Sequence, residues 1–262
     1  MGSSVSNRMT TINLEGAVAV VIGSSEGIGA AIAIGLANAG AMVVTGGRDA
    51  ERMSSTVGEI ERQGGKVDFE PVDVREPESI KSFSAAIIHR HGVATILVNS
   101  MGGTLIEKMV NVDVDEWDNL HNTHLRGTLL SCQAFQPGMR ASGYGKIINL
   151  SSLAGFRVAK NRGSYSVAKA GLNQLTCALA SEWGQFGIRV NGIAPSTTRT
   201  PRASAQLERE PQRESTIVER TPIGRLATTD DMVGPALFLA SPMSDFVSGQ
   251  TLAVDGGMLT VR

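Results

Sequence analysis

The sequence predicts an α/β fold in a single domain: a doubly wound parallel sheet of seven strands with helices on both faces. Short runs rich in valine and isoleucine alternate with helical patterns along the whole chain, as expected for parallel strands joined by right-handed crossovers. A glycine turn follows the first run, and polar residues follow most of the others. No repeat, linker or change of composition divides the 262 residues.

In the first half of the chain, each apolar run is followed by a helical pattern. The second run is followed by Asp49, a residue type that caps helix N-termini. We expect strands at residues 17–22, 42–45, 66–71 and 94–99, and helices at residues 30–40, 49–63 and 77–91.

In the second half, a helical pattern from about 113 to 136 should end at Pro137-Gly138, because proline interrupts helical hydrogen bonding. Residues 196–222 are charged and poor in apolar side chains, and we interpret them as a mobile substrate lid. A surface excursion without a role is the alternative. The remaining expected elements are strands at residues 146–150, 188–195 and 250–255, and helices at 164–184 and 229–241.

The glycine turn reads Gly23-Ser-Ser-Glu-Gly27-Ile-Gly29 and lies between a strand and a helix. Glycines allow the backbone to approach a pyrophosphate, while the helix N-terminus supplies N–H groups and a positive dipole. Strand, glycine turn, helix and strand together predict a dinucleotide-binding fold of the Rossmann type. A turn without a ligand is the alternative.

A second pattern combines Ser152 with Tyr165 and Lys169. The tyrosine and the lysine are four residues apart, so on a helix they share one face. An ammonium beside a phenol favours the phenolate, which would suit Tyr165 to acid–base work on an alcohol or carbonyl oxygen. An ordinary contact between the two side chains on a helix surface is the alternative.

Composition excludes several function classes. A net charge of −1 and a pI near 6.4 give no basic footprint for nucleic acid. Cys132 and Cys177 both fall in helical patterns and are expected to be reduced core thiols. No apolar run reaches transmembrane length and no signal peptide is evident, so we expect a cytoplasmic protein without a membrane partner. Residues 1–13 are expected to form a flexible extension, and residues 14–262 the catalytic domain.

Over residues 14–258, the chain resembles the short-chain dehydrogenase/reductase family, and most of all the branch of 3-oxoacyl-carrier-protein reductases, glucose dehydrogenases and hydroxysteroid dehydrogenases. The resemblance rests on ordered motifs: the glycine turn, Asp73-Val74, Ser152, Tyr165-x-x-x-Lys169, Arg189-Val-Asn191, Pro195 with Thr200, and Asp255-Gly-Gly. It implies a Rossmann-type fold, a small carbonyl or alcohol substrate and self-association, usually as a homotetramer and otherwise as a dimer.

The resemblance also implies site residues. Tyr165 would be the general acid/base, Ser152 would hold the substrate oxygen, and Lys169 would lower the pKa of the tyrosine. The implied cofactor-binding residues are Gly23, Ser25, Gly27, Ile28, Gly29, Arg48, Asp73, Val74, Asn99, Gly102, Tyr165, Lys169, Pro195, Thr198 and Thr200.

The chain departs from the family pattern at Ile22, at Ser100-Met101, at Ser196 and above all at His124. His124 stands where the family has an asparagine that holds a relay water, so we list it as a catalytic residue. A neutral imidazole can serve the relay through its two ring nitrogens, and a side chain turned away from the site is the alternative. His121 stands three residues before it, but no further residue at metal-ligand spacing accompanies the pair, so no metal is expected.

We expect NADP(H) rather than NAD(H) as the cofactor. The place just past the second strand, where a carboxylate selects NAD, holds Gly47 and then Arg48, whose guanidinium suits a 2′-phosphate. Glu26 in the glycine turn favours NAD(H) instead. The predicted activity is hydride transfer between the nicotinamide and a ketone or secondary alcohol, with 3-oxoacyl substrates among the candidates. The alternative is a cofactor-binding sensor or scaffold with little turnover.

Overall fold

The computed structural model describes residues 12–261 and contains one seven-stranded parallel sheet with the strand order β3-β2-β1-β4-β5-β6-β9. The expected flexible extension at residues 1–13 lies almost entirely outside the described part. The order reverses between β1 and β4, which is where ligands bind in such sheets. The strands are β1 (Val18–Ile22), β2 (Met42–Gly47), β3 (Lys66–Pro71), β4 (Ile96–Asn99), β5 (Gly145–Leu150), β6 (Ile188–Pro195) and β9 (Thr251–Val254).

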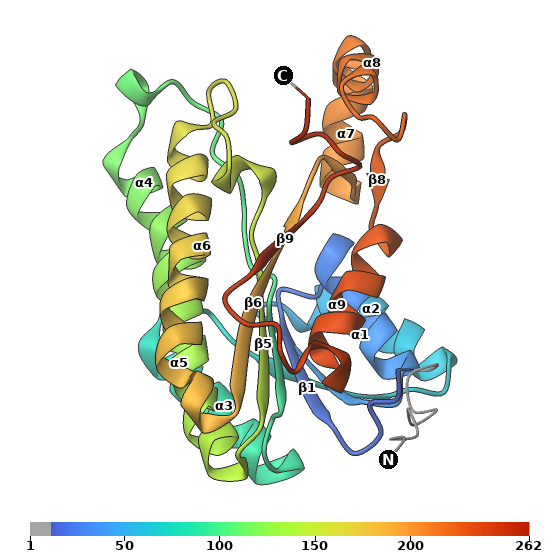
Figure 1. The fold of residues 1–262 in the computed structure, drawn as a ribbon, viewed down its shortest axis with the longest axis vertical. Helices are drawn as coiled ribbons and strands as arrows, with labels where there is room; N and C mark the ends of the chain where they lie inside the picture. Colours follow the sequence, from blue (N-terminus) through green and yellow to red (C-terminus); the bar gives the residue numbers. More distant parts are fainter. Residues whose placement is uncertain (1–11, 262) are drawn as a thin grey trace, which may run out of the picture.

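Helices cover both faces of this sheet (Figure 1). One face is covered by α3 (Pro77–His91), α4 (Val114–His121), α5 (Gly127–Ser142) and α6 (Gly163–Trp183). The other is covered by α1 (Gly27–Asn38), α2 (Ala50–Arg62) and α9 (Val233–Ala240). Alternate strand residues pack into separate cores on the two faces: Val20 belongs to the first core, while Ala19 and Val21 belong to the second. The predicted fold class is confirmed.

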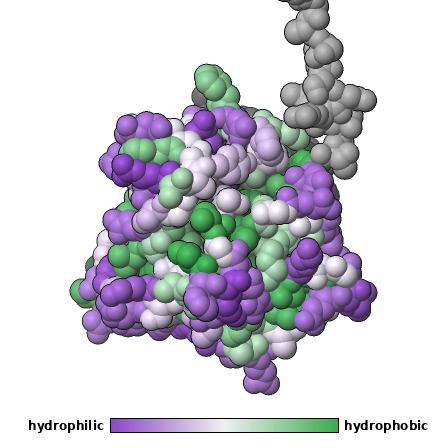
Figure 2. Space-filling model, turned by 90° about the horizontal axis from the view of Figure 1, so that it is seen from below, coloured by the Kyte–Doolittle hydropathy of each residue, from purple (hydrophilic) through white to green (hydrophobic). Residues whose placement is uncertain are grey.

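Seen from below, hydrophilic residues form most of the outline of the molecule, and hydrophobic residues gather near the centre of that face (Figure 2). Apolar residues therefore reach the surface near the centre of this face. Among the helices between residues 12 and 261, none has the length and apolar character that crossing a membrane would require.

The prediction that a helix ends at Pro137 is wrong. A helix α4, a π turn at Asn122–Arg126 and the helix α5 follow one another, and α5 continues through Pro137 to Ser142. Phe135 and Met139, on either side of the proline, are buried in the core. Their packing therefore outweighs the backbone hydrogen bond that one proline removes.

Residues 196–222 contain two helices that the sequence analysis did not predict, α7 (Pro201–Arg209) and α8 (Pro211–Glu219). Each begins with a proline at its first position, where the missing N–H costs nothing. The Thr200 side chain caps α7 by accepting from the Ala203 N–H. The two helices lie at the top of Figure 1, with two-residue strands, β7 (Thr198–Arg199) and β8 (Ala227–Thr228), beneath them.

The prediction of two core thiols is right for Cys132 and wrong for Cys177. Both are free; Cys132 is fully buried, and burial raises the pKa of its thiol to about 12. Cys177 is exposed because the buried face of α6 runs through Leu172, Thr176 and Leu179, and position 177 falls outside it.

Candidate active site

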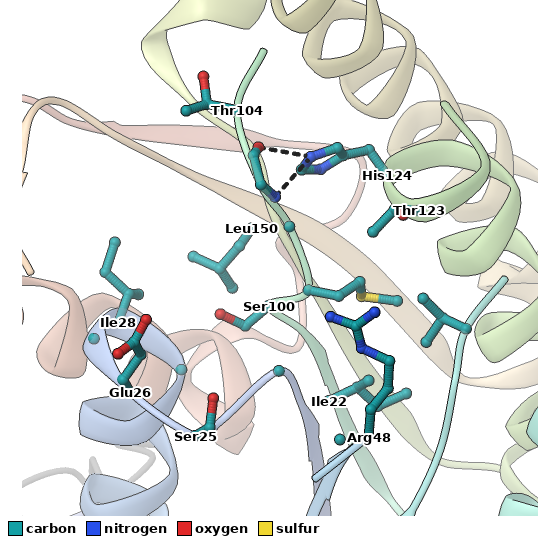
Figure 3. Close-up of a pocket in the computed structure, with 18 of the residues that line it drawn as sticks. Ile22, Ser25, Glu26, Ile28, Arg48, Ser100, Thr104, Thr123, His124 and Leu150 are labelled. Carbon is teal, nitrogen blue, oxygen red and sulfur yellow. Dashed lines mark hydrogen bonds between the residues drawn. The ribbon is translucent and has the colours of Figure 1, made fainter. Parts of the chain in front are cut away.

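A cavity of about 900 Å³ opens at the carboxyl ends of the strands, at the point where the strand order reverses. The glycine turn and Arg48 lie at one end of it, and His124 and Thr104 lie at the other (Figure 3). The residues from the sequence analysis that line it are Gly23, Ser25, Gly27, Ile28, Gly29, Arg48, Asp73, Val74, Gly102, His124, Tyr165, Lys169, Pro195 and Thr200.

The glycine turn brings the backbone ends of β1 and β4 very close together. Gly23 has a φ of +85°, and a Cβ there would lie 2.7 Å from the backbone nitrogen of Met101. A Cβ on Gly29 would overlap the Gly23 carbonyl oxygen. The turn ends at the N-terminus of α1, so it provides a bare backbone and a positive helix end, which fit the pyrophosphate of a dinucleotide.

Charged residues surround the outer end of the cavity. Arg75 pairs with Asp73 at 2.5 Å and holds the pKa of that carboxyl below its ordinary value. Glu26 from the glycine turn lies 3.5 Å from Arg52 of α2. Arg48 extends from the end of β2 into the cavity, and no carboxylate of residues 12–261 pairs with it.

Tyr165 and Lys169 begin α6 and face the inner end of the cavity, as their spacing predicted. The Lys169 Nζ lies 5.7 Å from the centre of the tyrosine ring and donates to the Leu150 carbonyl oxygen at 2.6 Å. Lys169 is buried without a carboxylate, and this desolvation lowers its pKa to about 7.

In the described structure, burial has the largest effect on the pKa of Tyr165. Burial raises the pKa of Tyr165 above its ordinary value, and the groups that oppose this rise are Ser152 and Arg162. A buried lysine with a pKa near 7 carries only part of its charge at neutral pH, so it stabilises a phenolate less than an exposed ammonium would.

His124 lies in the π turn between α4 and α5 and is buried. Its Nε2 lies 3.0 Å from the Gly103 carbonyl oxygen and 3.3 Å from the Gly103 nitrogen (Figure 3). The shorter contact fits the tautomer with the ring proton on Nε2, in which the Gly103 N–H cannot donate to that nitrogen and Nδ1 is an acceptor. Nδ1 is buried without a partner among the described residues. A Cβ on Gly102 would lie 2.5 Å from the ring, so this glycine makes room for it.

The His124 ring is also in contact with the other residues of the inner end. It meets the Tyr165 ring edge to face, with centroids 5.6 Å apart. Burial and the nearby Lys169 charge hold the pKa of His124 well below its ordinary value. The imidazole is therefore neutral at physiological pH, and it faces the site rather than turning away.

A family model described as Enoyl-(Acyl carrier protein) reductase matches residues 22–259. The relatives that match this chain over nearly its whole length include dehydrogenases and reductases. The chain belongs to the short-chain dehydrogenase/reductase family. This enzyme is therefore an oxidoreductase that acts on CH–OH or C=O groups with a nicotinamide cofactor.

Several relatives show the range of the family. The 2-dehydro-3-deoxy-D-gluconate 5-dehydrogenase of Escherichia coli is 34% identical, over 96% of this chain and 98% of its own. The 3-oxoacyl-[acyl-carrier-protein] reductase of Thermotoga maritima is 32% identical, over 95% and 100%. The solved gluconate 5-dehydrogenase of Burkholderia cenocepacia, in complex with NADP and tartrate, is 33% identical with a TM-score of 0.92, over 96% and 98%.

Three predicted site residues of this dehydrogenase/reductase do not line the cavity. Asn99 is buried and donates to Asn149 Oδ1 at 2.9 Å, so its side chain joins strands β4 and β5. Ser152 lies beside Tyr165, but its hydroxyl caps the next turn by accepting from the Ala154 N–H. Thr198 is buried and donates to the Ser196 carbonyl oxygen.

Other lining residues were missed by the sequence analysis, including Ser151, Met101, Thr104 and Arg202. Ser151 and Met101 follow strand ends, so their positions carried a signal that could have been used. Arg202 lies within the segment 196–222 that was interpreted as a substrate lid, but only the helix α7 shows which of its side chains reaches the cavity. Within residues 12–261, no group of three possible metal ligands gathers.

Proposed function

We propose that this enzyme transfers a hydride between NADP(H) and a ketone or secondary alcohol, with Tyr165 as the general acid/base. The observation that supports it is the convergence of Tyr165, Lys169 and His124 at the end of the cavity opposite the glycine turn. A dinucleotide bound along the cavity would have its pyrophosphate at the glycine turn, and when bound it supplies or accepts the hydride.

In this proposal, the Tyr165 hydroxyl gives a proton to the substrate oxygen during reduction and takes it back during oxidation. Ser152 holds the same oxygen, because its hydroxyl already lies beside that of Tyr165. The proton that Tyr165 loses is replaced through Lys169 and a water that bonds to Nδ1 of His124. The buried, unpaired Nδ1 supports that last step.

Replacing Tyr165 tests the assignment. Tyr165→Phe should lower kcat by about 10²–10⁴-fold, the usual contribution of general acid–base catalysis, while the cofactor still binds. The matched control is Tyr144→Phe, which removes the hydroxyl of the other tyrosine in the chain. A phenylalanine variant with near-normal kcat would remove Tyr165 from the mechanism.

Arg48 supports NADP(H) as the cofactor, since an unpaired guanidinium at the outer end of the cavity suits a 2′-phosphate. Three solved relatives, the Burkholderia enzyme among them, hold NADP. Fluorescence titration should show tighter binding of NADPH than of NADH, and Arg48→Ala should reduce the difference. Tighter NADH binding that Arg48→Ala leaves unchanged would contradict this proposal.

Turnover separates the enzyme from the alternative of a sensor with this fold. A panel with D-gluconate, 3-oxoacyl thioesters and simple secondary alcohols covers the chemistry that the names of the relatives suggest. We expect oxidation or reduction of at least one class. A protein that binds cofactor tightly and turns over none of them would favour the sensor.

We further propose that the enzyme is a homotetramer. Two separate groups of apolar side chains are exposed, one near the long helices with Val110 and Val114, and one beside β9 with Met243, Phe246 and Leu252. A tetramer of dihedral symmetry needs two different self-complementary patches, and these groups supply two candidates.

A further inference from the structure

Two arginines lie beside the Gly103-Thr104 segment of the cavity wall: Arg202 lines the cavity itself, and Arg162 lies behind Thr104. Arg162, three residues before Tyr165, donates to the Thr104 hydroxyl at 3.3 Å, and Thr104 lines the cavity. Arg202 reaches the cavity from α7, and its Nη1 lies 3.8 Å from the place of a Cβ on Gly103. The two guanidinium groups therefore border one short segment, Gly103-Thr104, from two different elements.

Neither arginine has an acidic partner among residues 12–261, although eleven ion pairs occur elsewhere in that range. The acids near Arg162 are engaged: Glu210 pairs with Arg213 at 3.3 Å, and Glu107 accepts from the Lys108 N–H at 2.6 Å. Arg162 is half-buried, and this burial lowers its pKa. A partly desolvated guanidinium with one neutral partner lacks the anion that usually compensates it.

We propose that the substrate carries a carboxylate that Arg162 and Arg202 hold, so that the enzyme acts on hydroxy acids and oxo acids rather than on neutral alcohols. This inference rests on the proposed function of the same site. Arginine suits the role because its planar fork binds a carboxylate through two parallel hydrogen bonds. The carboxylate would enter on the Thr104 side, with the reacting carbon beside Tyr165.

The competing role for these arginines is binding a phosphate of the cofactor. The geometry favours the substrate, because Arg202 lies against Gly103, whose backbone contacts His124, at the end of the cavity opposite Arg48. Arg162 acts beside Tyr165, since its charge opposes the rise in the pKa of that phenol. Cofactor affinity therefore distinguishes the two roles.

Binding of an acid and of its neutral counterpart tests the proposal without turnover. The probes are L-tartrate and L-threitol, which share a carbon chain and differ in having carboxylates or hydroxymethyl groups. Isothermal titration uses the enzyme loaded with the nicotinamide cofactor that it binds. We expect tartrate binding in the wild type and a loss of about tenfold to a hundredfold in Arg162→Met and in Arg202→Met, as for a charge-assisted pair. Arg162→Lys should recover part of it.

The matched control is Arg209→Met, which removes an exposed arginine of the same helix as Arg202 and should leave tartrate affinity unchanged. Threitol binding and cofactor affinity should be alike in all variants. The proposal is overturned if the wild type does not bind tartrate, if both methionine variants bind it normally, or if their main loss is in cofactor affinity.

A kinetic comparison distinguishes failure of this inference from failure of the proposed function. D-Gluconate and D-glucitol differ only at C1, which is a carboxylate in one and a hydroxymethyl group in the other. Preference for D-gluconate that disappears in Arg162→Met supports the inference. Equal turnover of the two contradicts it and leaves the oxidoreductase assignment intact. Absence of turnover with any acid or alcohol, together with normal tartrate binding, contradicts the proposed function alone.

Discussion

His124 is the residue at which this chain departs most from its family, and its surroundings make a pH prediction possible. The imidazole accepts through Nδ1 only while it is neutral, so the relay works above its pKa and fails below it. Because burial and Lys169 lower that pKa well below the ordinary 6.5, the acid limb of kcat should lie well below pH 6.5. Steady-state pH–rate profiles measure it.

His124→Asn is the comparison for this prediction, since an amide accepts and donates at every working pH. The variant should keep substantial activity and lose the inflection of the acid limb. Superimposable profiles of wild type and variant down to the pH at which the protein unfolds would show that His124 does not serve the relay.

For single residues, the sequence predicted that Tyr165 and Lys169 lie together at the cavity, but it did not predict their pKa values. The spacing of Tyr165 and Lys169 correctly placed both on one face of a helix at the cavity. It could not show that Lys169 is buried with a pKa near 7, or that burial raises the pKa of Tyr165. Desolvation depends on every element packed around a group, and this information is not local in the sequence.

At the scale of elements, the helices α7 and α8 lead to a prediction about motion. Helix α7 carries Arg202 at the cavity, and few side chains of the two helices are buried; Leu207 is one. Elements with little buried apolar surface open readily, and a ligand that bridges them to the site should hold them closed. Hydrogen exchange of residues 201–219 should therefore slow when cofactor and D-gluconate or tartrate bind together.

The central part of α6 serves as the internal reference in that experiment, because it is a long helix with one buried face and its amides should stay protected with or without ligand. Slowed exchange with cofactor alone, and no further change with the acid, would argue that this segment responds to the cofactor and is not a substrate lid.

Most strands and helices were predictable because their patterns are local. Strand β6 and helix α3 have the bounds that the sequence indicated. One error arose where packing overrode a local signal: α5 continues through Pro137 because its neighbours are buried. The other was a local signal left unused: the Thr200 cap and the prolines at positions 201 and 211 mark helix starts in the charged residues 201–219. Only the three-dimensional structure shows that the Asn99 side chain bonds to Asn149 and does not line the cavity.

At the scale of the whole molecule, the two exposed apolar groups predict how the assembly should come apart. A glutamate in one patch places charge in one interface only, so Phe246→Glu and Val114→Glu should each give dimers. The double variant should be monomeric. Light scattering coupled to size-exclusion chromatography measures the mass of each species against the 27.5 kDa chain.

Ile88→Glu is the control for that series, because Ile88 is a partly exposed apolar residue of α3 that belongs to neither group. It should leave the mass unchanged. A wild type that is monomeric at micromolar concentration, or single variants that keep the wild-type mass, would contradict the tetramer.

Because one of the two thiols is buried and the other is exposed, the chain has a single cysteine that a labelling reagent can reach. Only a thiolate is alkylated, so Cys132, buried and with a pKa of about 12, should remain unmodified at neutral pH. Cys177 is exposed on α6, and its sulfur lies 3.3 Å from the Gly249 carbonyl oxygen, close to β9. On the unassembled chain, a maleimide dye should therefore attach at one place without any substitution, on the same helix that carries Tyr165 and Lys169.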